Sequence, residues 1–348
     1  MRNLLLTLPG AFLAACLLGG CTVDRLSLKT DAPAVAAPMP TELAQRFAYT
    51  PQRAEPALER VEDTAEWEKF TGVYKVAASG EDAARDVTYR YWRSKVGSGP
   101  RPLVVIVPIL AGNYPECDYL GQLMARSGMH AFFVHREDNL LAFDKDKSEP
   151  FEVKLRRSIV NIRRTLDWAC AQPEVDPRRV GLVGISLGAI GGTIVLAVEP
   201  RITAGVLIMG GGDLPGIVSD SIETPVRRYK VHKMRDNGWT EAEFKADVRR
   251  QLPSDPLDYA PFIGPRRVQQ FISLYDNKVP TEYQWKLWRA LGEPEGYAIP
   301  IGHYTSIFYL GFAERNAMAF LGKHLGASVV AGAPLPAGGK LAAATPPR

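Results

Sequence analysis

A Gly-x-Ser-x-Gly pentapeptide at residues 184–188 constrains this sequence more than any other feature. The apolar run that precedes it, residues 180–185, is typical of a strand buried on both faces of a parallel sheet. Small and apolar residues continue after it through Val198 without a turn signal before Pro200, which predicts a helix. Ser186 therefore stands at a sharp strand-to-helix turn, where its backbone is strained and its neighbours must be small.

The glycines around Ser186 fit such a turn. Gly184 and Gly188 supply the small neighbours, and we expect Gly191 and Gly192 to let the new helix lie near the sheet. The pattern is that of a nucleophile elbow. Two alternatives are a glycine-rich turn with an incidental serine and a degenerate dinucleotide-binding fingerprint. The latter lacks its middle glycine, and no acidic residue follows about twenty positions on.

Composition indicates a globular protein with a large core. The chain has 348 residues, of which 46% are hydrophobic and 23% charged, with a formal net charge of +4. Its arginine pairs are spread along the sequence and interleaved with acidic residues, which is typical of solvated faces. We therefore expect no nucleic-acid partner.

The first residues, 1–21, are typical of a targeting segment. Arg2 precedes an apolar core that is too short to span a bilayer comfortably. The core ends in Leu-Gly-Gly-Cys at 18–21, which resembles a bacterial lipoprotein lipobox. The resemblance implies cleavage before Cys21 and lipid attachment there, and Thr22 favours the outer membrane, facing the periplasm, over inner-membrane retention. An ordinary secretory signal with an incidental cysteine is the alternative.

The remainder divides into three parts. Residues 22–57, rich in Ala, Pro and Thr, predict a flexible tether; residues 58–326 predict the folded domain; and residues 327–348 predict a disordered tail. At the start of the domain, residues 70–76 and 87–92 predict a hairpin of two strands.

Strands and helices then alternate along the chain. We predict strands at 103–107, 131–134, 180–185, 205–209, 268–275 and 297–301, and helices at 119–127, 151–171, 280–291 and 306–325. The alternation predicts an α/β fold with an eight-stranded, mostly parallel sheet and helices on both faces.

One long insertion interrupts this alternation at residues 213–261. Two charged helices are predicted within it, at 226–237 and 240–252, the second opened by a capping box from Thr240 to Glu243. Because long insertions in a regular repeat are usually functional, we interpret it as a helical lid over the sheet edge, after the sixth strand.

At this point residues 70–325 resemble the α/β-hydrolase superfamily, in which a serine, an acid and a histidine follow one another in the chain. Asp276, followed by Val279-Pro280, is similar to the acid turn of that family, and His303 is similar to its histidine after the last strand. The resemblance implies a catalytic triad of Ser186, Asp276 and His303. Each would lie past the carboxyl end of a strand, so one sheet edge would present all three.

Other residues could fill two of these positions. Asp213 also follows a strand end and is the alternative acid, whereas Asp255 and Asp258 are more typical of turn caps. By resemblance, the oxyanion hole would use the backbone N–H of Leu187 and a second N–H from Leu110 or Ile109. Here the sequence departs from the family, because Pro108-Ile109 stands where His-Gly is usual.

The two cysteines of the predicted domain are expected to be unpaired. Cys117 lies near the start of a helix at the active-site edge, and Cys170 ends a helix at the opposite edge, too far for a disulfide.

These features favour a lipid-anchored serine hydrolase that cleaves small or lipid-like carboxyl esters through an acyl-enzyme, without a metal or organic cofactor. A peptidase or an acyltransferase would use the same residues. A non-catalytic envelope lipoprotein that uses the fold for binding is a third hypothesis.

Overall fold

The computed structural model describes residues 23–29, 31, 37–51, 56–78, 84–110, 114–136 and 150–327. The expected signal peptide, with Cys21, and the expected tail beyond residue 327 lie outside these ranges.

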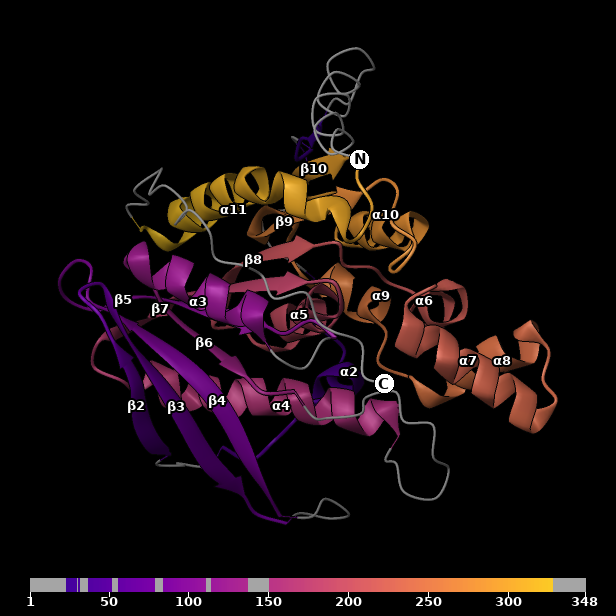
Figure 1. The fold of residues 1–348 in the computed structure, drawn as a ribbon, viewed down its shortest axis with the longest axis horizontal. Coiled ribbons are helices and arrows are strands. Elements are labelled where there is room, and N and C mark those ends of the chain that lie inside the picture. The colour runs from indigo at the N-terminus through magenta and orange to yellow at the C-terminus, as the bar shows by residue number, and fades with distance from the viewer. Residues whose placement is uncertain are drawn as a thin grey trace, which may run out of the picture.

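A single ten-stranded sheet runs through the domain, in the order β1-β10-β9-β8-β7-β5-β6-β4-β3-β2 (Figure 1). From β6 to β10 neighbouring strands are parallel, whereas β1, β2, β3 and β4 pair antiparallel. The strands are β1 Asp24–Leu26, β2 Ala57–Asp63, β3 Trp67–Val76, β4 Arg85–Ser94, β5 Arg101–Val107, β6 His130–Val134, β7 Val175–Ile185, β8 Ile202–Ile208, β9 Val268–Ser273 and β10 Glu295–Ile299.

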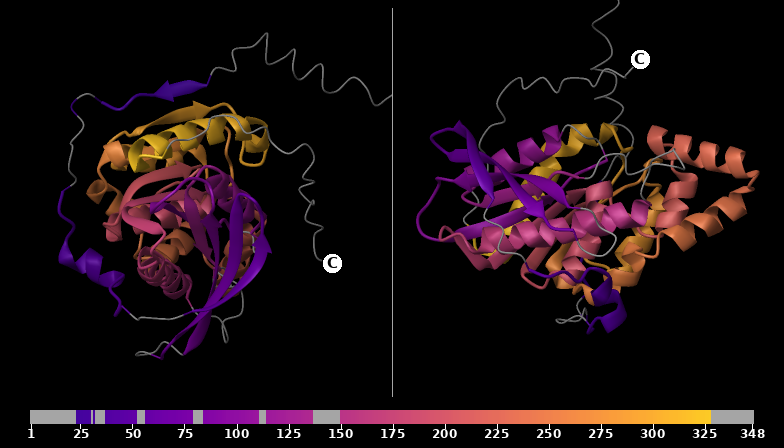
Figure 2. Two further views of the ribbon diagram at one scale, coloured as in Figure 1. Left: turned by 90° about the vertical axis from the view of Figure 1, so that its left-hand side faces the viewer. Right: turned by 90° about the horizontal axis from the view of Figure 1, so that it is seen from below.

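Helices pack on both faces of this sheet, as predicted (Figures 1 and 2). Helices α4, α5 and α10 contribute to one buried cluster, and α3 and α11 to the other. The helices are α2 Thr41–Arg46, α3 Pro115–Arg126, α4 Phe151–Cys170, α5 Leu187–Val198, α6 Leu214–Asp220, α7 Thr224–Asn237, α8 Glu241–Gln251, α9 Pro256–Tyr259, α10 Thr281–Ala290 and α11 Leu310–Leu325.

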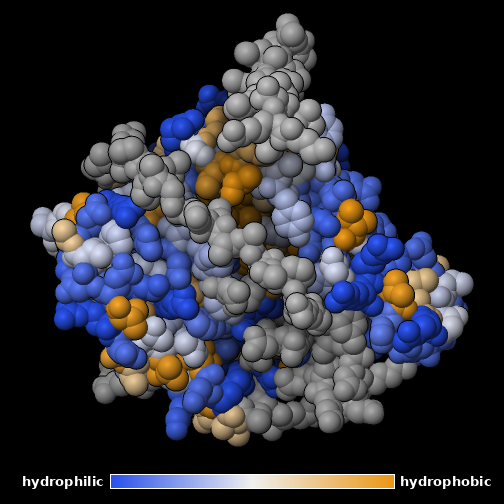
Figure 3. Space-filling model, in the orientation of Figure 1, coloured by the Kyte–Doolittle hydropathy of each residue, from blue (hydrophilic) through white to orange (hydrophobic). Residues whose placement is uncertain are grey.

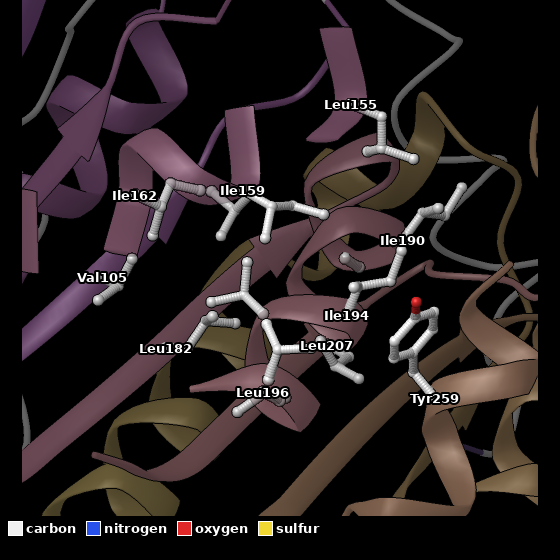
Figure 4. Close-up of a cluster of buried hydrophobic side chains, with 14 of the residues drawn as sticks. Val105, Leu155, Ile159, Ile162, Leu182, Ile190, Ile194, Leu196, Leu207 and Tyr259 are labelled. Atoms are coloured by element: carbon white, nitrogen blue, oxygen red, sulfur yellow. The ribbon is translucent and has the colours of Figure 1, made fainter. Parts of the chain in front are cut away.

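The core follows from alternation along the strands. In β5, Val105 points toward α4 and α5, whereas Val104 and Ile106 point toward α3 and α11. Figure 4 shows apolar side chains of α4, including Ile159, against Leu182 of β7. Both faces of the central strands are therefore buried, which explains their nearly continuous apolar sequences.

The expectation of eight strands was wrong by two. The additional strands are β1, which pairs with β10, and β2, which pairs with β3. Most side chains of both strands are exposed, so neither carries the apolar alternation that marks a half-buried strand. Backbone pairing at the sheet edges creates these strands, and a sequence pattern does not record it.

Part of the expected tether is also packed onto the domain. Phe47, which follows α2, is fully buried and its ring lies edge-to-face on Tyr259, with centroids 5.6 Å apart. Its carbonyl accepts a hydrogen bond from Arg163 at 2.7 Å, and Tyr49 donates one to Asp167 at 2.8 Å. This ring and these two hydrogen bonds hold the segment, and such isolated contacts leave no periodic pattern in the sequence.

Helices α6, α7, α8 and α9 form the insertion between β8 and β9, here called the helical insertion. Helices α7 and α8 project together from the body of the domain (Figures 1 and 2). The predicted capping box is present, since Thr240 accepts from the Glu243 N–H at 3.3 Å and Glu243 accepts from the Thr240 N–H at 2.8 Å. The short helices α6 and α9 were not predicted. Among the helices of the described ranges, none is both long and apolar enough to cross a membrane.

Candidate active site

The pentapeptide forms a tight turn between β7 and α5. The backbone of Ser186 has φ 55° and ψ −121°, and residues other than glycine rarely adopt a positive φ. Its N–H donates to the carbonyl of Ile208 on the neighbouring strand β8 at 2.8 Å, which anchors the turn to the sheet. The strained serine that the sequence predicted is therefore present.

Backbone contacts explain the two glycines of the motif. A Cβ on Gly184 would lie 2.3 Å from the carbonyl oxygen of Gly188. A Cβ on Gly188 would lie 2.1 Å from the carbonyl oxygen of Val107, at the end of β5. Gly188 thus allows the serine turn to lie directly against the loop that begins at Pro108.

The two glycines of helix α5 behave differently. A Cβ on Gly192 would lie 3.0 Å from Leu182 of the sheet, as expected for close packing. At Gly191 the nearest atom, on Leu155, would be 4.0 Å away, so a methyl group would fit. The expectation that Gly191 is needed for packing against the sheet was wrong, because it faces α4 rather than the strands.

Asp276 and His303 lie in direct contact. The Nδ1 of His303 lies 2.7 Å from Oδ2 of Asp276, whose side chain is completely buried. The aspartate is fixed by backbone N–H groups of Lys278 at 2.8 Å and Val279 at 3.1 Å, and by the amide of Gln284 at 3.0 Å. These donors hold the side chain in place, and its Oδ2 accepts the hydrogen bond from Nδ1–H of the imidazole.

Asp213, the alternative acid, has other partners. It caps α6 by accepting from the Gly216 N–H at 3.2 Å, and it pairs with Lys286 at 2.8 Å and Arg249 at 3.5 Å. Burial alone would raise the pKa of Asp213, but the hydrogen bond from Lys286 and that from the Gly216 N–H lower it overall. Asp255 also caps a helix, accepting from the Leu257 N–H at 2.9 Å.

Ser186 and His303 line one cavity of about 630 Å³. No hydrogen bond joins their side chains within the described part of the chain. Figure 3 shows a hollow with hydrophobic walls near the middle of the face toward the viewer. Most of the lining is apolar. Its side chains come from the loop after β5, from α5, from the residue after β8, from the helical insertion, and from the segment before α11 and the start of α11: Ile109, Leu110, Ile190, Met209, Leu214, Ile217, Val218, Val226, Ile307 and Leu310.

The expected oxyanion-hole residues also lie on this cavity. Leu187 begins α5, so its N–H is one of the first-turn donors that have no partner inside the helix. Leu110 and Ile109 line the cavity from the loop after β5. The end of that loop, residues 111–113, lies outside the described ranges.

A polar cluster connects the helical insertion to two loops, the one that follows Asp276 and the one that carries His303. Tyr304, next to His303, donates to Glu223 at 2.7 Å, and the ammonium of Lys278 lies 3.9 Å from the same carboxylate. Burial and the hydrogen bond to Glu223 raise the pKa of Tyr304 to about 12. No sequence pattern indicates this cluster, because its members come from separate segments of the chain.

Cys117 and Cys170 are both free, as predicted. Burial raises the pKa of the Cys170 thiol to about 11, so this thiol is protonated at neutral pH and a poor nucleophile. In the ranges that the structure describes, no group of three or more His, Cys, Asp or Glu side chains is arranged to hold a metal ion.

Comparison with known proteins gives similarity at the level of the fold. No protein-family model and no curated protein sequence matches the chain. Among solved structures, acetyl xylan esterase 1 from Thermoanaerobacterium sp. JW/SL YS485 matches with a TM-score of 0.58 at 14% identity, over 80% of this chain and 95% of that one. An acetyl xylan esterase from Paenibacillus sp. R4 matches with a TM-score of 0.56 at 17% identity, over 81% and 96% of the two chains. The glucuronoyl esterase from Solibacter usitatus matches with a TM-score of 0.50 at 14% identity, over 83% and 96%. The protein described here thus has the α/β-hydrolase fold.

Proposed function

We propose that this protein is a serine hydrolase that cleaves carboxyl esters through an acyl-enzyme. The observation that carries the proposal is the placement of a strained Ser186 on the same apolar cavity as a histidine that is bonded to a buried aspartate. The fold that the chain shares with solved esterases supports the same assignment.

In the first half of the reaction, Nε2 of His303 accepts the hydroxyl proton as Oγ of Ser186 attacks the carbonyl carbon of the ester. The resulting oxyanion accepts hydrogen bonds from the backbone N–H of Leu187 and of Leu110. Asp276 stabilises the imidazolium. The bond to the alcohol oxygen then breaks, and His303 returns the proton to the leaving alkoxide.

In the second half, water replaces the alcohol. His303 accepts a proton from water as the water oxygen attacks the acyl carbon. The bond between that carbon and Oγ of Ser186 then breaks, and His303 returns the proton to Oγ. The products are one carboxylic acid and one alcohol, and the enzyme is regenerated. An alcohol or an amine as acceptor in this half would give a transferase, and an amide substrate would give a peptidase.

Labelling with a fluorophosphonate probe and hydrolysis of short-chain esters test the proposal. Ser186→Ala is expected to lose labelling and to lower kcat by on the order of 10⁶. Ser221→Ala is the control, because it removes a hydroxyl from the same cavity but leaves the turn at Ser186 intact. This variant should still be labelled at Ser186. A Ser186→Ala protein that keeps a tenth of the wild-type turnover would exclude this mechanism, and an unlabelled wild-type protein would favour a binding role.

For location, we propose a lipid anchor on Cys21 that holds the domain at a bacterial membrane, on the periplasmic side of the outer membrane. The Leu-Gly-Gly-Cys sequence at 18–21 supports it.

A further inference from the structure

Strand β1 determines where the proposed anchor meets the domain. It pairs antiparallel with β10 at the end of the sheet, and its first residue, Asp24, lies opposite Ala298, near the carboxyl end of β10 (Figure 2, left). Cys21 precedes Asp24 by three positions, so their Cα atoms lie at most about 11 Å apart. Because β10 leads into the loop that carries His303, an anchor on Cys21 would hold the domain by the edge that presents the active site.

The same edge of the sheet exposes apolar side chains. Four of them are exposed over 49% to 76% of their surface and are here called the apolar rim: Tyr275, Tyr304, Ile307 and Phe308. Their two loops lie together, since the N–H of Tyr275 donates to the carbonyl of Ile301 at 2.9 Å. Tyr304 and Ile307 also line the cavity of Ser186, so the rim borders the opening of that cavity. An exposed apolar patch beside a cavity is typical of a surface that something else covers.

Positive charge lies beside the apolar rim. The ammonium of Lys278 lies 5.5 Å from the ring centroid of Tyr304, and it donates to the carbonyl of Ile222 at 3.1 Å. Ile222 lines a surface hollow together with Arg227 and Arg228 of α7, and both arginines are exposed. Anionic lipid headgroups attract such side chains. An apolar rim flanked by cations therefore complements the surface of a bilayer.

We propose that the apolar rim binds the surface of the bilayer that holds the anchor, so that the cavity opens onto the membrane and takes esters whose acyl chains lie in it. This inference rests on the proposed anchor and on the proposed ester hydrolysis. Aromatic side chains are favoured at the boundary between lipid and water. The cavity of about 630 Å³ has apolar walls, so an acyl chain can pass from the bilayer to Ser186 without entering water. Hydrolysis of a soluble ester needs no such contact.

Two esters with the same leaving group test the inference. The lipidated full-length protein is reconstituted into vesicles of phosphatidylethanolamine and the anionic phosphatidylglycerol. p-Nitrophenyl butyrate reaches the enzyme from water, whereas p-nitrophenyl palmitate is held in the bilayer. The measured quantity is kcat/KM for the palmitate divided by kcat/KM for the butyrate, because this ratio does not depend on the amount of active protein.

The variant Tyr275→Ser with Phe308→Ser changes two rim side chains that do not line the cavity. It should lower the ratio by on the order of tenfold, because burial of one aromatic side chain alone shifts an equilibrium by about that factor or more. The lipid anchor keeps the variant on the vesicles, so the loss reports how the domain is oriented and not whether it is attached. Hydrolysis of the butyrate and fluorophosphonate labelling of Ser186 should stay in place.

The variant Leu58→Ser with Val61→Ser is the matched control. It also removes two exposed apolar side chains, but from β2 at the opposite end of the sheet, and it should leave the ratio unchanged. An unchanged ratio in the rim variant, an equal fall in the β2 variant, or a wild-type protein that cleaves only the butyrate would overturn the inference while ester hydrolysis stands.

Other outcomes identify what else has failed. A wild-type dimer in detergent that becomes a monomer in the rim variant would assign the rim to a second copy of the chain and overturn membrane binding. A wild-type protein that does not float with the vesicles would overturn the anchor and this inference with it. A wild-type protein that cleaves neither ester and is not labelled would overturn the proposed function.

Discussion

Two aspartates follow strand ends near the site, and their contacts separate their roles. The carboxylate of Asp276 accepts the bond from Nδ1 of His303 at 2.7 Å, whereas that of Asp213 is held by Lys286 at 2.8 Å. Asp276→Asn is expected to lower kcat/KM for esters by on the order of 10³ or more, because an amide no longer favours the tautomer that leaves Nε2 free to accept the serine proton.

Asp213→Asn is the control, since it removes a carboxylate from the same edge of the sheet. It should affect stability through the lost pair with Lys286 far more than catalysis. Steady-state kinetics measure kcat/KM for esters in both variants. Equal losses of kcat/KM, or a larger loss in Asp213→Asn, would contradict the assignment of Asp276 as the acid.

At the scale of elements, helix α5 contains a matched pair of glycines. In Gly188→Ala the new methyl would lie 2.1 Å from the carbonyl oxygen of Val107. The backbone at position 188 cannot move away from this oxygen without shifting the neighbouring Leu187. We expect a loss of about 3 kcal/mol or more in the free energy of unfolding. We also expect weaker probe labelling, because the serine turn must move away from the loop after β5.

Gly191→Ala adds the same methyl three residues later, where the nearest atom is 4.0 Å away. There alanine should raise the free energy of unfolding by about 0.5–1 kcal/mol, through its better helix propensity. Urea unfolding of the two variants measures both effects. Similar destabilisation in both would mean that helix packing, and not contact with Val107, requires glycine at position 188.

At the scale of the whole molecule, the anchor and the domain are expected to act independently. Cys21→Ser should release the protein into the soluble fraction, or leave an uncleaved precursor, without changing hydrolysis of a small soluble ester. Each buried acyl CH₂ contributes about 0.8 kcal/mol to membrane binding, so loss of the lipidated residue removes most of the attachment. Cell fractionation measures the location, and kcat/KM on the purified proteins measures the activity.

A Cys21→Ser protein that is processed normally yet stays with the membranes would contradict the anchor. The domain holds two parts of the expected linker: β1 at Asp24–Leu26 pairs with β10, and Phe47 packs against Tyr259. The chain therefore meets the domain well before residue 57.

Local chemistry made much of this protein predictable from its sequence. The apolar run before Ser186 and the glycines at 184 and 188 determined the strand, the strained turn and the helix, because each depends on neighbours within a few residues. The alternation of strands and helices likewise indicated a parallel sheet, whose carboxyl ends meet at one edge. That topology is enough to bring Asp276 and His303 together.

Only the tertiary structure decided features that depend on residues far apart in the chain. The edge strands β1 and β2 exist through backbone pairing, and Gln284 holds Asp276 from a helix that its sequence does not mark as part of a site. A periodic pattern records which face of an element is buried, but it does not record which groups are left without a partner when the elements pack.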